Sequence, residues 1–287
     1  MPTSSPSRAV LITGCSTGIG RATAEHLAAA GWTVYATARR AEAVADLEAK
    51  GCRTLALDVV DETSMQAAVS AVEEAEGAVG VLINNAGYSQ SGAIESVGMD
   101  AVRAQFETNV FGLVRMCQLV LPGMRRQGWG KIVNLSSMGG RFTFPGGGYY
   151  HATKHAVEAL SDALRFEVGG FGVDVIIIEP GLIRTEFSET AAGGIDEQAR
   201  DDGPYGEFNA AVARSTTSAY EKGPLAKLGG PPEAVAEVIA KALAASRPRA
   251  RYTVTPSARL LLTQRAIMPD RAWDAMLRAQ FKQPGKA

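Results

Sequence analysis

The chain has 287 residues, of which 46% are hydrophobic and 21% are charged, and its formal net charge at pH 7 is −1. This length suits one large domain or two small ones, and the nearly neutral charge gives no electrostatic reason to expect nucleic acid as a partner. The three cysteines, Cys15, Cys52 and Cys117, are widely spaced and odd in number. They argue against a disulfide framework and a cysteine-based zinc site, and they predict a reducing, cytoplasmic location.

Targeting, membrane and metal signals are weak in this sequence. The first eight residues are polar and lack the apolar core of a signal peptide. No apolar stretch approaches the ~18 residues that a membrane-spanning helix needs. His151 and His155 stand four residues apart and could face one metal ion, but no third ligand at a suitable spacing accompanies them. We therefore expect no metal site.

Short apolar runs rich in β-branched residues alternate with helical patterns along most of the chain. Asp61 is the expected N-cap of the third helix, and Pro122 is expected to bend the long fourth one. Runs such as Val10-Leu-Ile-Thr13 lack polar alternation, so the strands should be buried on both faces, as in a parallel sheet covered by helices. Strands are expected over residues 9–13, 33–38, 53–57, 79–84, 131–136, 174–179 and 252–255, and helices over 20–30, 41–50, 62–76, 99–127, 150–168 and 231–245.

This alternation predicts an α/β fold, a single Rossmann-type doubly wound parallel sheet of about seven strands flanked by helices. Residues 1–287 are read as one domain because no linker or internal repeat divides them. Residues 182–230 are rich in Gly, Ala, Ser and Thr, and we read them as a substrate lid with one or two short helices.

Residues 256–287 are read as an amphipathic C-terminal extension. From Ser246 onward, nine Lys or Arg residues stand against two Asp, a surplus of seven positive charges. Such a tail can lie on anionic lipid, or it can cover the core and leave its arginines in water. We favour the second reading and expect no membrane contact.

A glycine-rich turn joins the first predicted strand to the first predicted helix. Glycines let the backbone turn tightly and approach a pyrophosphate, and the start of the following helix favours negative charge. With further βα units behind it, the turn predicts a dinucleotide site, the alternative being an ordinary βα turn. The candidate cofactor residues of this turn are Gly14, Ser16, Thr17, Gly18, Ile19 and Gly20.

The end of the second strand indicates which dinucleotide is bound. NAD sites usually place an acidic residue there, whereas this chain has Arg39 and Arg40. A guanidinium group can bind a phosphate through two hydrogen bonds, so we predict NADP(H) in preference to NAD(H), with Arg39 the better candidate. After the third strand, Asp58 could accept a hydrogen bond from the adenine amino group or cap the next helix. Val59 beside it is a further cofactor candidate.

Tyr150 and Lys154 are four residues apart on a predicted helix, so both side chains project from one face. An ammonium beside a phenol favours the phenolate and would lower the pKa of Tyr150 by roughly 1–3 units, toward the range of a general acid or base. Ser137, thirteen residues earlier, can hold the oxygen of a carbonyl or alcohol. Taken alone, the pair could also be a surface tyrosine over a solvated lysine.

Together, four ordered motifs resemble those of the short-chain dehydrogenase/reductase family over about residues 8–185. Asn109 matches the fourth member of that family's catalytic tetrad. The surrounding sequence is most similar to the hydroxysteroid and retinol dehydrogenase branch. The motifs are Thr13-Gly14-x-x-x-Gly18-Ile19-Gly20, Asn84-Asn85-Ala86-Gly87, Ser137 with Tyr150-x-x-x-Lys154, and Pro180-Gly181-x-Ile183-x-Thr185.

The resemblance implies a role for each matched residue. Tyr150 would exchange a proton with a substrate oxygen that Ser137 holds. Lys154 would lower the pKa of the tyrosine and bind the nicotinamide ribose, and Asn109 would fix a water that links Lys154 to solvent. Asn109 could instead be a structural amide that bridges two strands, and Thr185 could be a helix cap. The cofactor would further be lined by Asn85, Ala86, Gly87, Pro180, Gly181, Ile183 and Thr185.

We therefore expect an NADP(H)-dependent oxidoreductase that interconverts a lipophilic ketone or aldehyde and its alcohol. The alternative is a non-catalytic NADP(H)-binding regulator of the same fold, and a nucleotide-sugar epimerase or dehydratase ranks below it. Several of the expected pocket walls could instead only pack the lid. These walls are mostly apolar or aromatic: Tyr88, Ser137, Met138, Phe142, Phe144, Leu182, Phe187 and Tyr220.

The end of the chain bears on the oligomeric state. Many members of the family end in a strand and a Gly-rich tail that pack into a tetramer, whereas this chain continues after Tyr252 with Pro256 and an Arg-rich segment. We therefore expect a homodimer through the helices over 99–127 and 150–168, with a tetramer as the alternative.

Overall fold

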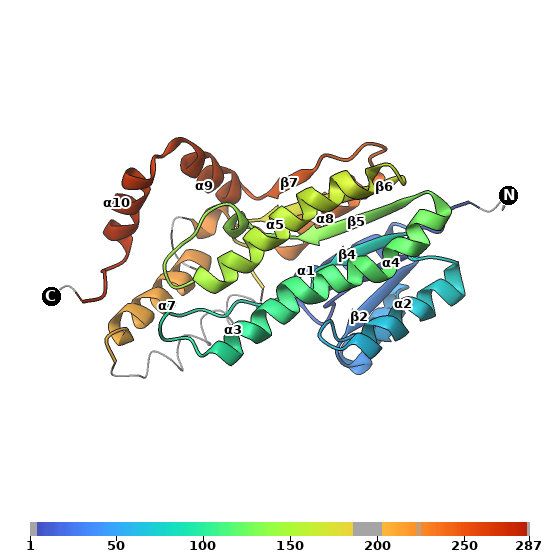
Figure 1. The fold of residues 1–287 in the computed structure, drawn as a ribbon, viewed down its shortest axis with the longest axis horizontal. Coiled ribbons are helices and arrows are strands. Elements are labelled where there is room, and N and C mark those ends of the chain that lie inside the picture. The colour runs from blue at the N-terminus through green and yellow to red at the C-terminus, as the bar shows by residue number, and fades with distance from the viewer. Residues whose placement is uncertain (1–4, 186–202, 222, 224, 286–287) are drawn as a thin grey trace.

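A computed structural model describes residues 5–185, 203–221, 223 and 225–285 of the chain. Within them, seven strands form one parallel sheet in the order β3-β2-β1-β4-β5-β6-β7, which confirms the predicted doubly wound fold (Figure 1). The chain reverses its direction of travel across the sheet between β1 and β4, and ligands of such sheets bind where the strand order reverses. The strands are β1 (Val10–Ile12), β2 (Val34–Ala38), β3 (Arg53–Ala56), β4 (Val81–Asn84), β5 (Gly130–Leu135), β6 (Val173–Pro180) and β7 (Arg251–Val254).

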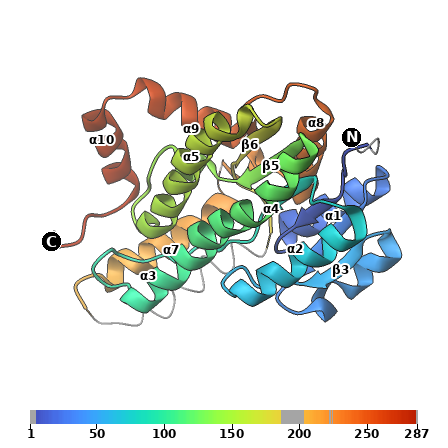
Figure 2. The ribbon, with the colours of Figure 1, turned by 45° about the vertical axis from the view of Figure 1, so that its right-hand side comes forward.

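Each face of the sheet has its own apolar core. Successive strand residues point to opposite faces, so Ile12 belongs to one core and Leu11 to the other, and both side chains are fully buried. Burial of one such side chain contributes roughly 1.5–3 kcal/mol. Of the described helices, α1 (Gly18–Ala29), η1 (Ala41–Lys50) and α8 (Pro232–Ala244) pack on one face, and α2 (Glu62–Glu76), α4 (Leu113–Gln127) and α5 (Gly148–Gly169) pack on the other. Figure 2 shows these helices around the sheet.

The long helix expected over residues 99–127 is divided into three parts. It begins as α3 (Met99–Phe106), widens into a π-helical turn, η2 (Glu107–Gly112), and continues as α4. Pro122, where a bend is expected, lies inside α4, and the regular α-helix is interrupted earlier, at η2. π-Helical turns are rare and often mark functional positions, and this one contains Asn109.

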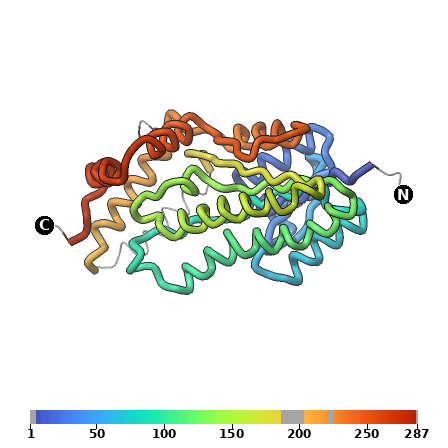
Figure 3. Tube along the Cα trace, turned by 45° about the horizontal axis from the view of Figure 1, so that its top comes forward, coloured from blue at the N-terminus to red at the C-terminus, as the bar shows by residue number. Residues whose placement is uncertain are grey.

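The C-terminal extension covers the core. It forms α9 (Pro256–Ile267) and α10 (Asp270–Gln280), and Trp273 of α10 is buried with its ring centroid 5.6 Å from that of Phe142 and 5.9 Å from that of Phe144. Figure 3 shows α10 beside α7 (Gly206–Glu221), at the end of the molecule opposite the N-terminus. This packing agrees with the reading in which the tail covers the core and leaves its arginines in water.

The expected lid over 182–230 contains α7 and η4 (Ala226–Leu228), while residues 186–202 lie outside the described part of the chain. Short 3₁₀ turns occur elsewhere, and η3 (Met138–Gly140) connects β5 to α5. Among the described helices, none combines the length and the apolarity needed to cross a membrane.

Candidate active site

The glycine-rich turn lies at the carboxyl end of β1, where α1 begins. Gly14 and Gly18 have φ angles of +73° and +60°, which only glycine adopts readily. A Cβ on Gly20 would lie 2.3 Å from the Gly14 carbonyl oxygen, so this position also requires glycine. The turn therefore brings backbone groups and the N-terminus of α1 to one surface, an arrangement that suits an anionic pyrophosphate.

Thr13 and Asn85 hold this turn against the neighbouring strand. The Thr13 hydroxyl accepts hydrogen bonds from the backbone N–H groups of Asn85 and Ala86, both at 3.0 Å. The Asn85 amide donates in return to the carbonyl oxygens of Thr13 and Gly14, at 2.9 and 2.8 Å. The side chains of Asn85 and Thr13 thus both hold the glycine-rich turn in its shape. This role of Thr13 was not predicted, although its place between the strand and Gly14 is a usable signal.

The arginines expected to select the dinucleotide are exposed. Arg39 and Arg40 follow β2, and neither guanidinium has a hydrogen bond or ion pair with any residue that the structure describes. Both are thus available for a phosphate group. Of the two uses considered for Asp58, the helix cap is wrong. Asp61 caps α2 through the N–H groups of Thr63 and Ser64, whereas the Asp58 carboxylate accepts from the N–H of Val60 at 3.1 Å.

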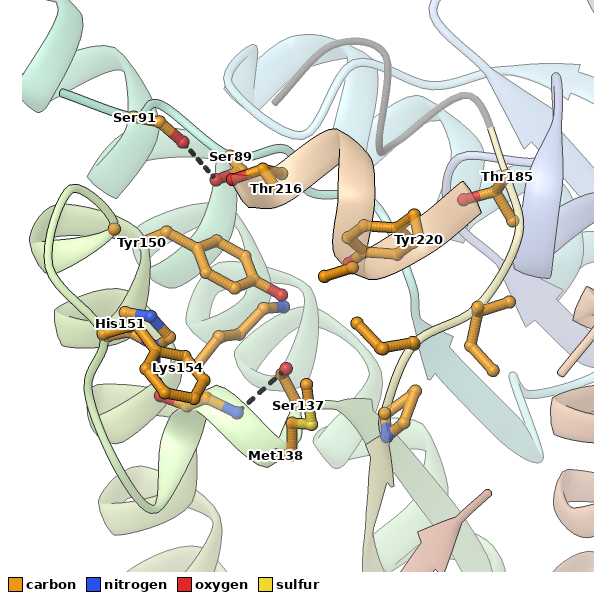
Figure 4. A pocket seen from close by; sticks show the side chains of 18 of the residues that line it. Ser89, Ser91, Ser137, Met138, Tyr150, His151, Lys154, Thr185, Thr216 and Tyr220 are labelled. Atoms are coloured by element: carbon orange, nitrogen blue, oxygen red, sulfur yellow. Dashed lines mark hydrogen bonds between the residues drawn. The ribbon is translucent and has the colours of Figure 1, made fainter. Parts of the chain in front are cut away.

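Three of the four catalytic candidates, Ser137, Tyr150 and Lys154, line one cavity of about 490 Å³, and Tyr220 of α7 faces them (Figure 4). Ser137 follows β5, accepts a hydrogen bond from the Gly139 N–H at 3.0 Å and hydrogen-bonds to Tyr150. The Lys154 ammonium lies 5.8 Å from the centroid of the Tyr150 ring and donates to the Leu135 carbonyl oxygen at 2.7 Å.

The expected lowering of the Tyr150 pKa is wrong for this structure. Burial raises the pKa of Tyr150 above its ordinary value, the Ser137 hydrogen bond opposes this rise, and Tyr220 adds to it. Burial also lowers the pKa of Lys154 to about 8, which the negative charge of Glu158 opposes. The spacing of Tyr150 and Lys154 placed both groups on one face, but it carried no information on how deeply that face is buried.

Asn109 lies in the π-helical turn and connects the β4–α3 loop to α5. Its side-chain oxygen accepts from the Tyr88 N–H at 3.1 Å, and its amide donates to the Tyr88 carbonyl oxygen at 2.9 Å and to the Thr153 hydroxyl at 3.1 Å. The side chain is therefore a structural amide. It bridges a loop and a helix, whereas the alternative reading expected it to bridge two strands. The amide that bridges two strands is Asn84, which donates to Asn134 at 2.9 Å.

His151, considered from the sequence only as a possible metal ligand, is a further member of the site. Its ring is buried between two glycines: a Cβ on Gly139 would lie 2.4 Å from Nδ1, and one on Gly147 would lie 2.8 Å from Nε2. Nδ1 is 2.9 Å from the Gly139 carbonyl oxygen, and burial lowers the pKa of His151 to about 4. The imidazole is therefore neutral at pH 7 and rigidly held. Within the described residues, no cluster of three His, Cys, Asp or Glu side chains could hold a metal ion.

Most of the predicted site residues line this cavity. Gly20, Arg39, Arg40, Asp58, Val59, Ala86 and Asn109 do not, and Phe187 lies outside the described residues. The predicted residues on its walls are Gly14, Ser16, Thr17, Gly18, Ile19, Asn85, Gly87, Tyr88, Ser137, Met138, Phe142, Phe144, Tyr150, Lys154, Pro180, Gly181, Leu182, Ile183, Thr185 and Tyr220.

Val59 is buried away from the cavity, and its carbonyl oxygen would lie 2.4 Å from a Cβ on Gly112. Lining residues that were not predicted come mainly from four places, the β4–α3 loop, the segment from the end of β5 to the start of α5, α7 and the C-terminal extension. They include Ser89, Ser91, Val212, Thr216, Leu261 and Phe281.

Known proteins are similar to this chain in sequence and in fold. The family model for short chain dehydrogenase matches residues 8–194. An NADPH-dependent 3-dehydrocapnine reductase of Ornithobacterium rhinotracheale is 37% identical, with 96% of this chain and 98% of the relative aligned. The human 17-beta-hydroxysteroid dehydrogenase type 1 is 37% identical over 91% of this chain and 81% of its own.

Among solved structures, a short chain dehydrogenase/reductase from Burkholderia phymatum in complex with NAD is similar, with a TM-score of 0.77. It is 26% identical, and the match covers 98% of each chain. NADPH and NAD thus both occur among similar proteins. The fold, the ordered motifs and these matches show that the chain is an oxidoreductase and belongs to the short-chain dehydrogenase/reductase family, with its resemblance to the hydroxysteroid dehydrogenase branch confirmed.

Proposed function

We propose that the chain is an NADP(H)-dependent reductase and dehydrogenase of lipophilic carbonyl compounds, with Tyr150 as general acid and base. The observation that carries this proposal is one continuous cavity whose walls include the glycine-rich turn, the Ser137–Tyr150–Lys154 group and an aromatic surface at Phe142 and Phe144. A relative named as an NADPH-dependent reductase supports the same reading.

Two side chains would act on the substrate oxygen. Ser137 would orient this oxygen, and Tyr150 would donate its proton when a carbonyl is reduced. A phenol is protonated at neutral pH, and burial raises the pKa of Tyr150 further, so the site without substrate holds a proton that it can donate. Reduction should therefore predominate near neutral pH, and oxidation should increase as the pH rises.

The residues present fit a nicotinamide dinucleotide, which when bound supplies or accepts the hydride. The positive-φ glycines leave room for its pyrophosphate, and Arg39 and Arg40, which pair with no described residue, suit a 2′-phosphate. Lys154 would hold the nicotinamide ribose once its ammonium leaves the Leu135 carbonyl. A charged hydrogen bond contributes about 1.5–3 kcal/mol, so Arg39→Gln should weaken NADPH binding about tenfold or more and leave NADH binding unchanged. Arg40→Gln tests the second candidate, and Arg103→Gln, at an exposed arginine of α3 that is absent from the cavity lining, is the matched control.

The substrate is proposed to be neutral and lipophilic. Among the described residues that line the cavity, Lys154 is the one charged group, so no described carboxylate or guanidinium would hold a charged substrate. Phe142, Phe144 and Leu261 supply apolar surface that a ketone or aldehyde with a hydrocarbon body would cover.

The oligomeric state and the cytoplasmic location remain predictions. Exposed apolar side chains at Phe111 of η2 and at Leu160 and Phe166 of α5 support a homodimer through the long helices, with a tetramer as the alternative. Equilibrium sedimentation of the full chain would distinguish the two.

Oxidation of NADPH, followed with a panel of lipophilic ketones and aldehydes, tests the proposed reaction. Tyr150→Phe should abolish turnover and leave NADPH binding intact, because it removes only the proton donor. Tyr149→Phe is the matched control, since the Tyr149 hydroxyl donates to the Ile94 carbonyl oxygen at 3.0 Å and is absent from the cavity lining. Tight NADPH binding with no turnover on any substrate would favour the non-catalytic regulator instead.

A further inference from the structure

A second cavity, of about 340 Å³, adjoins the first. Two residues, Pro145 and Phe281, line both cavities and so form the partition between them. The remaining walls of the second cavity come from α7, α10 and the chain after α10: Phe208, Asp274, Leu277, Arg278, Lys282, Gln283 and Pro284. The active-site cavity therefore ends at a wall behind which more space lies.

Phe281 is held in the partition by packing. It directly follows α10, and its N–H donates to the Leu277 carbonyl oxygen at 2.8 Å. Its ring is partly buried against Val212, Ala213 and Phe208 of α7. The position of α10 is in turn fixed by Trp273, which packs on Phe142 and Phe144.

Pro145 is the less adjustable half of the partition. Its neighbour Gly146 has a φ angle of +81°, and a Cβ there would lie 2.5 Å from Val212, so this loop is fitted closely to α7. Phe281 can be shortened by substitution without changing the backbone. The charged residues of the second cavity are already paired: Arg278 lies 3.7 Å from Asp274, and Lys282 lies 4.0 Å from Glu207. The space behind the partition is therefore not a built site for an ion.

We infer that Phe281 is a specificity-determining residue that limits the length of the hydrocarbon chain a substrate can place in the active-site cavity. The inference rests on the proposed function for the class of substrate. Each methylene that leaves water should strengthen binding by up to about fourfold, about 0.8 kcal/mol. This gain stops at the methylene that meets Phe281. Removal of the Phe281 ring would join the two cavities, so affinity would continue to rise with each added methylene.

Straight-chain methyl ketones of increasing length test this limit. Their Kd values would be measured by calorimetry on the full chain with and without NADP⁺, and kcat/KM would be measured with NADPH. In the wild type, Kd should fall with each methylene and then level off. Phe281→Ala and Phe281→Leu should move this plateau to longer chains, and Phe281→Trp should move it to shorter ones.

Phe171→Ala is the matched control, because Phe171 is 50% exposed and is absent from the lining of both cavities, so its loss should leave the plateau in place. A plateau at the same chain length in all variants whose thermal unfolding stays cooperative would overturn the inference. Binding of the ketones without turnover would reject the proposed reaction, while the Kd series would still decide the role of Phe281. If no ketone bound, both the proposed function and the inferred role of Phe281 would be overturned.

Discussion

Replacing Lys154 with methionine should stabilise the folded protein near neutral pH, although it removes a residue of the proposed active site. Lys154 is 6% exposed, and its ammonium donates to the Leu135 carbonyl oxygen. Burial lowers its pKa from 10.5 to about 8, so the fold disfavours the charged form that the unfolded chain carries at pH 7. Methionine has a similar length and no charge, and it removes this penalty.

The size and sign of the effect follow from the two pKa values. A fall from 10.5 to about 8 corresponds to about 3 kcal/mol of destabilisation at pH 7. The Leu135 carbonyl would lose its donor in the variant, which costs about 1–3 kcal/mol. The net gain at pH 7 is therefore about 0–2 kcal/mol. Between pH 8 and 10.5 folded Lys154 is neutral while the unfolded chain keeps the proton, so wild-type stability rises there relative to the variant by about 3 kcal/mol.

Urea unfolding at intervals from pH 7 to 10.5 measures this difference. The free-energy difference between variant and wild type should decline through the window and reverse its sign near the upper end. Lys241→Met, which removes an exposed lysine from α8, controls for the loss of one ammonium and should show no such decline. A difference between Lys154→Met and wild type that stays constant with pH would refute the reasoning, because it would mean that the fold does not disfavour the Lys154 charge.

Three further substitutions test neighbouring features. Glu158→Gln removes the charge that opposes the lowering of the Lys154 pKa, so the alkaline limb of the pH–rate profile should move to lower pH; an unmoved limb would contradict this. His151→Asn should reduce acid sensitivity. The folded pKa of about 4 lies below the ordinary 6.5, so the wild type should lose about 3 kcal/mol as the pH falls through this range, and urea unfolding would show whether the variant loses as much. Thr13→Val deprives two backbone N–H groups of their acceptor and should lower stability by about 1–3 kcal/mol and weaken NADPH binding; unchanged affinity in fluorescence titration would count against a role in shaping the turn.

The sheet and the convergence of the motifs were predictable because they depend on local patterns. Buried strands such as Val10–Ile12 show as unbroken apolar runs, and the order of βα units then determines a parallel sheet. Once the sheet is parallel, Gly14 after β1 and Ser137 after β5 must lie at the same edge. Tyr150 and Lys154 were placed correctly relative to each other by the helix period alone.

The remaining features depend on contacts between distant segments, which no local pattern records. The π-helical turn at Asn109 occurs where the helix must join both the Tyr88 backbone and Thr153. The raised pKa of Tyr150 reflects burial by parts of the chain that follow it, including α7. Phe281 reaches the cavity only because α10 packs on α7. Its place in an amphipathic tail predicted burial but no particular partner.

Helix α5, which carries Tyr150 and Lys154, is joined to the last strand, β7, by ion pairs. Along α5, Tyr150, Lys154, Glu158 and Asp162 follow one another at four-residue spacing and so share one face. Arg251, the first residue of β7, binds Glu158 at 2.9 Å and Asp162 at 2.6 Å. Because Glu158 is buried, a shift of β7 would separate charges that have little access to water, which is costly. The position of β7 therefore constrains the face that presents Tyr150 and Lys154.

The chain that follows β7 contacts the wall of the proposed substrate cavity. After β7 the chain turns at Thr255, whose φ angle of +80° is costly for a β-branched residue and is held by the cap it provides to α9. This turn packs on Gly181, where a Cβ would lie 2.4 Å from the Thr255 hydroxyl oxygen. The continuous segment 251–281 thus makes three contacts. Arg251 binds α5, Thr255 packs on Gly181, and Phe281 lines the end of the cavity. A change in the extension that displaces Thr255 should therefore disturb catalysis as well as substrate choice, whereas a change confined to the Phe281 ring should alter substrate choice alone.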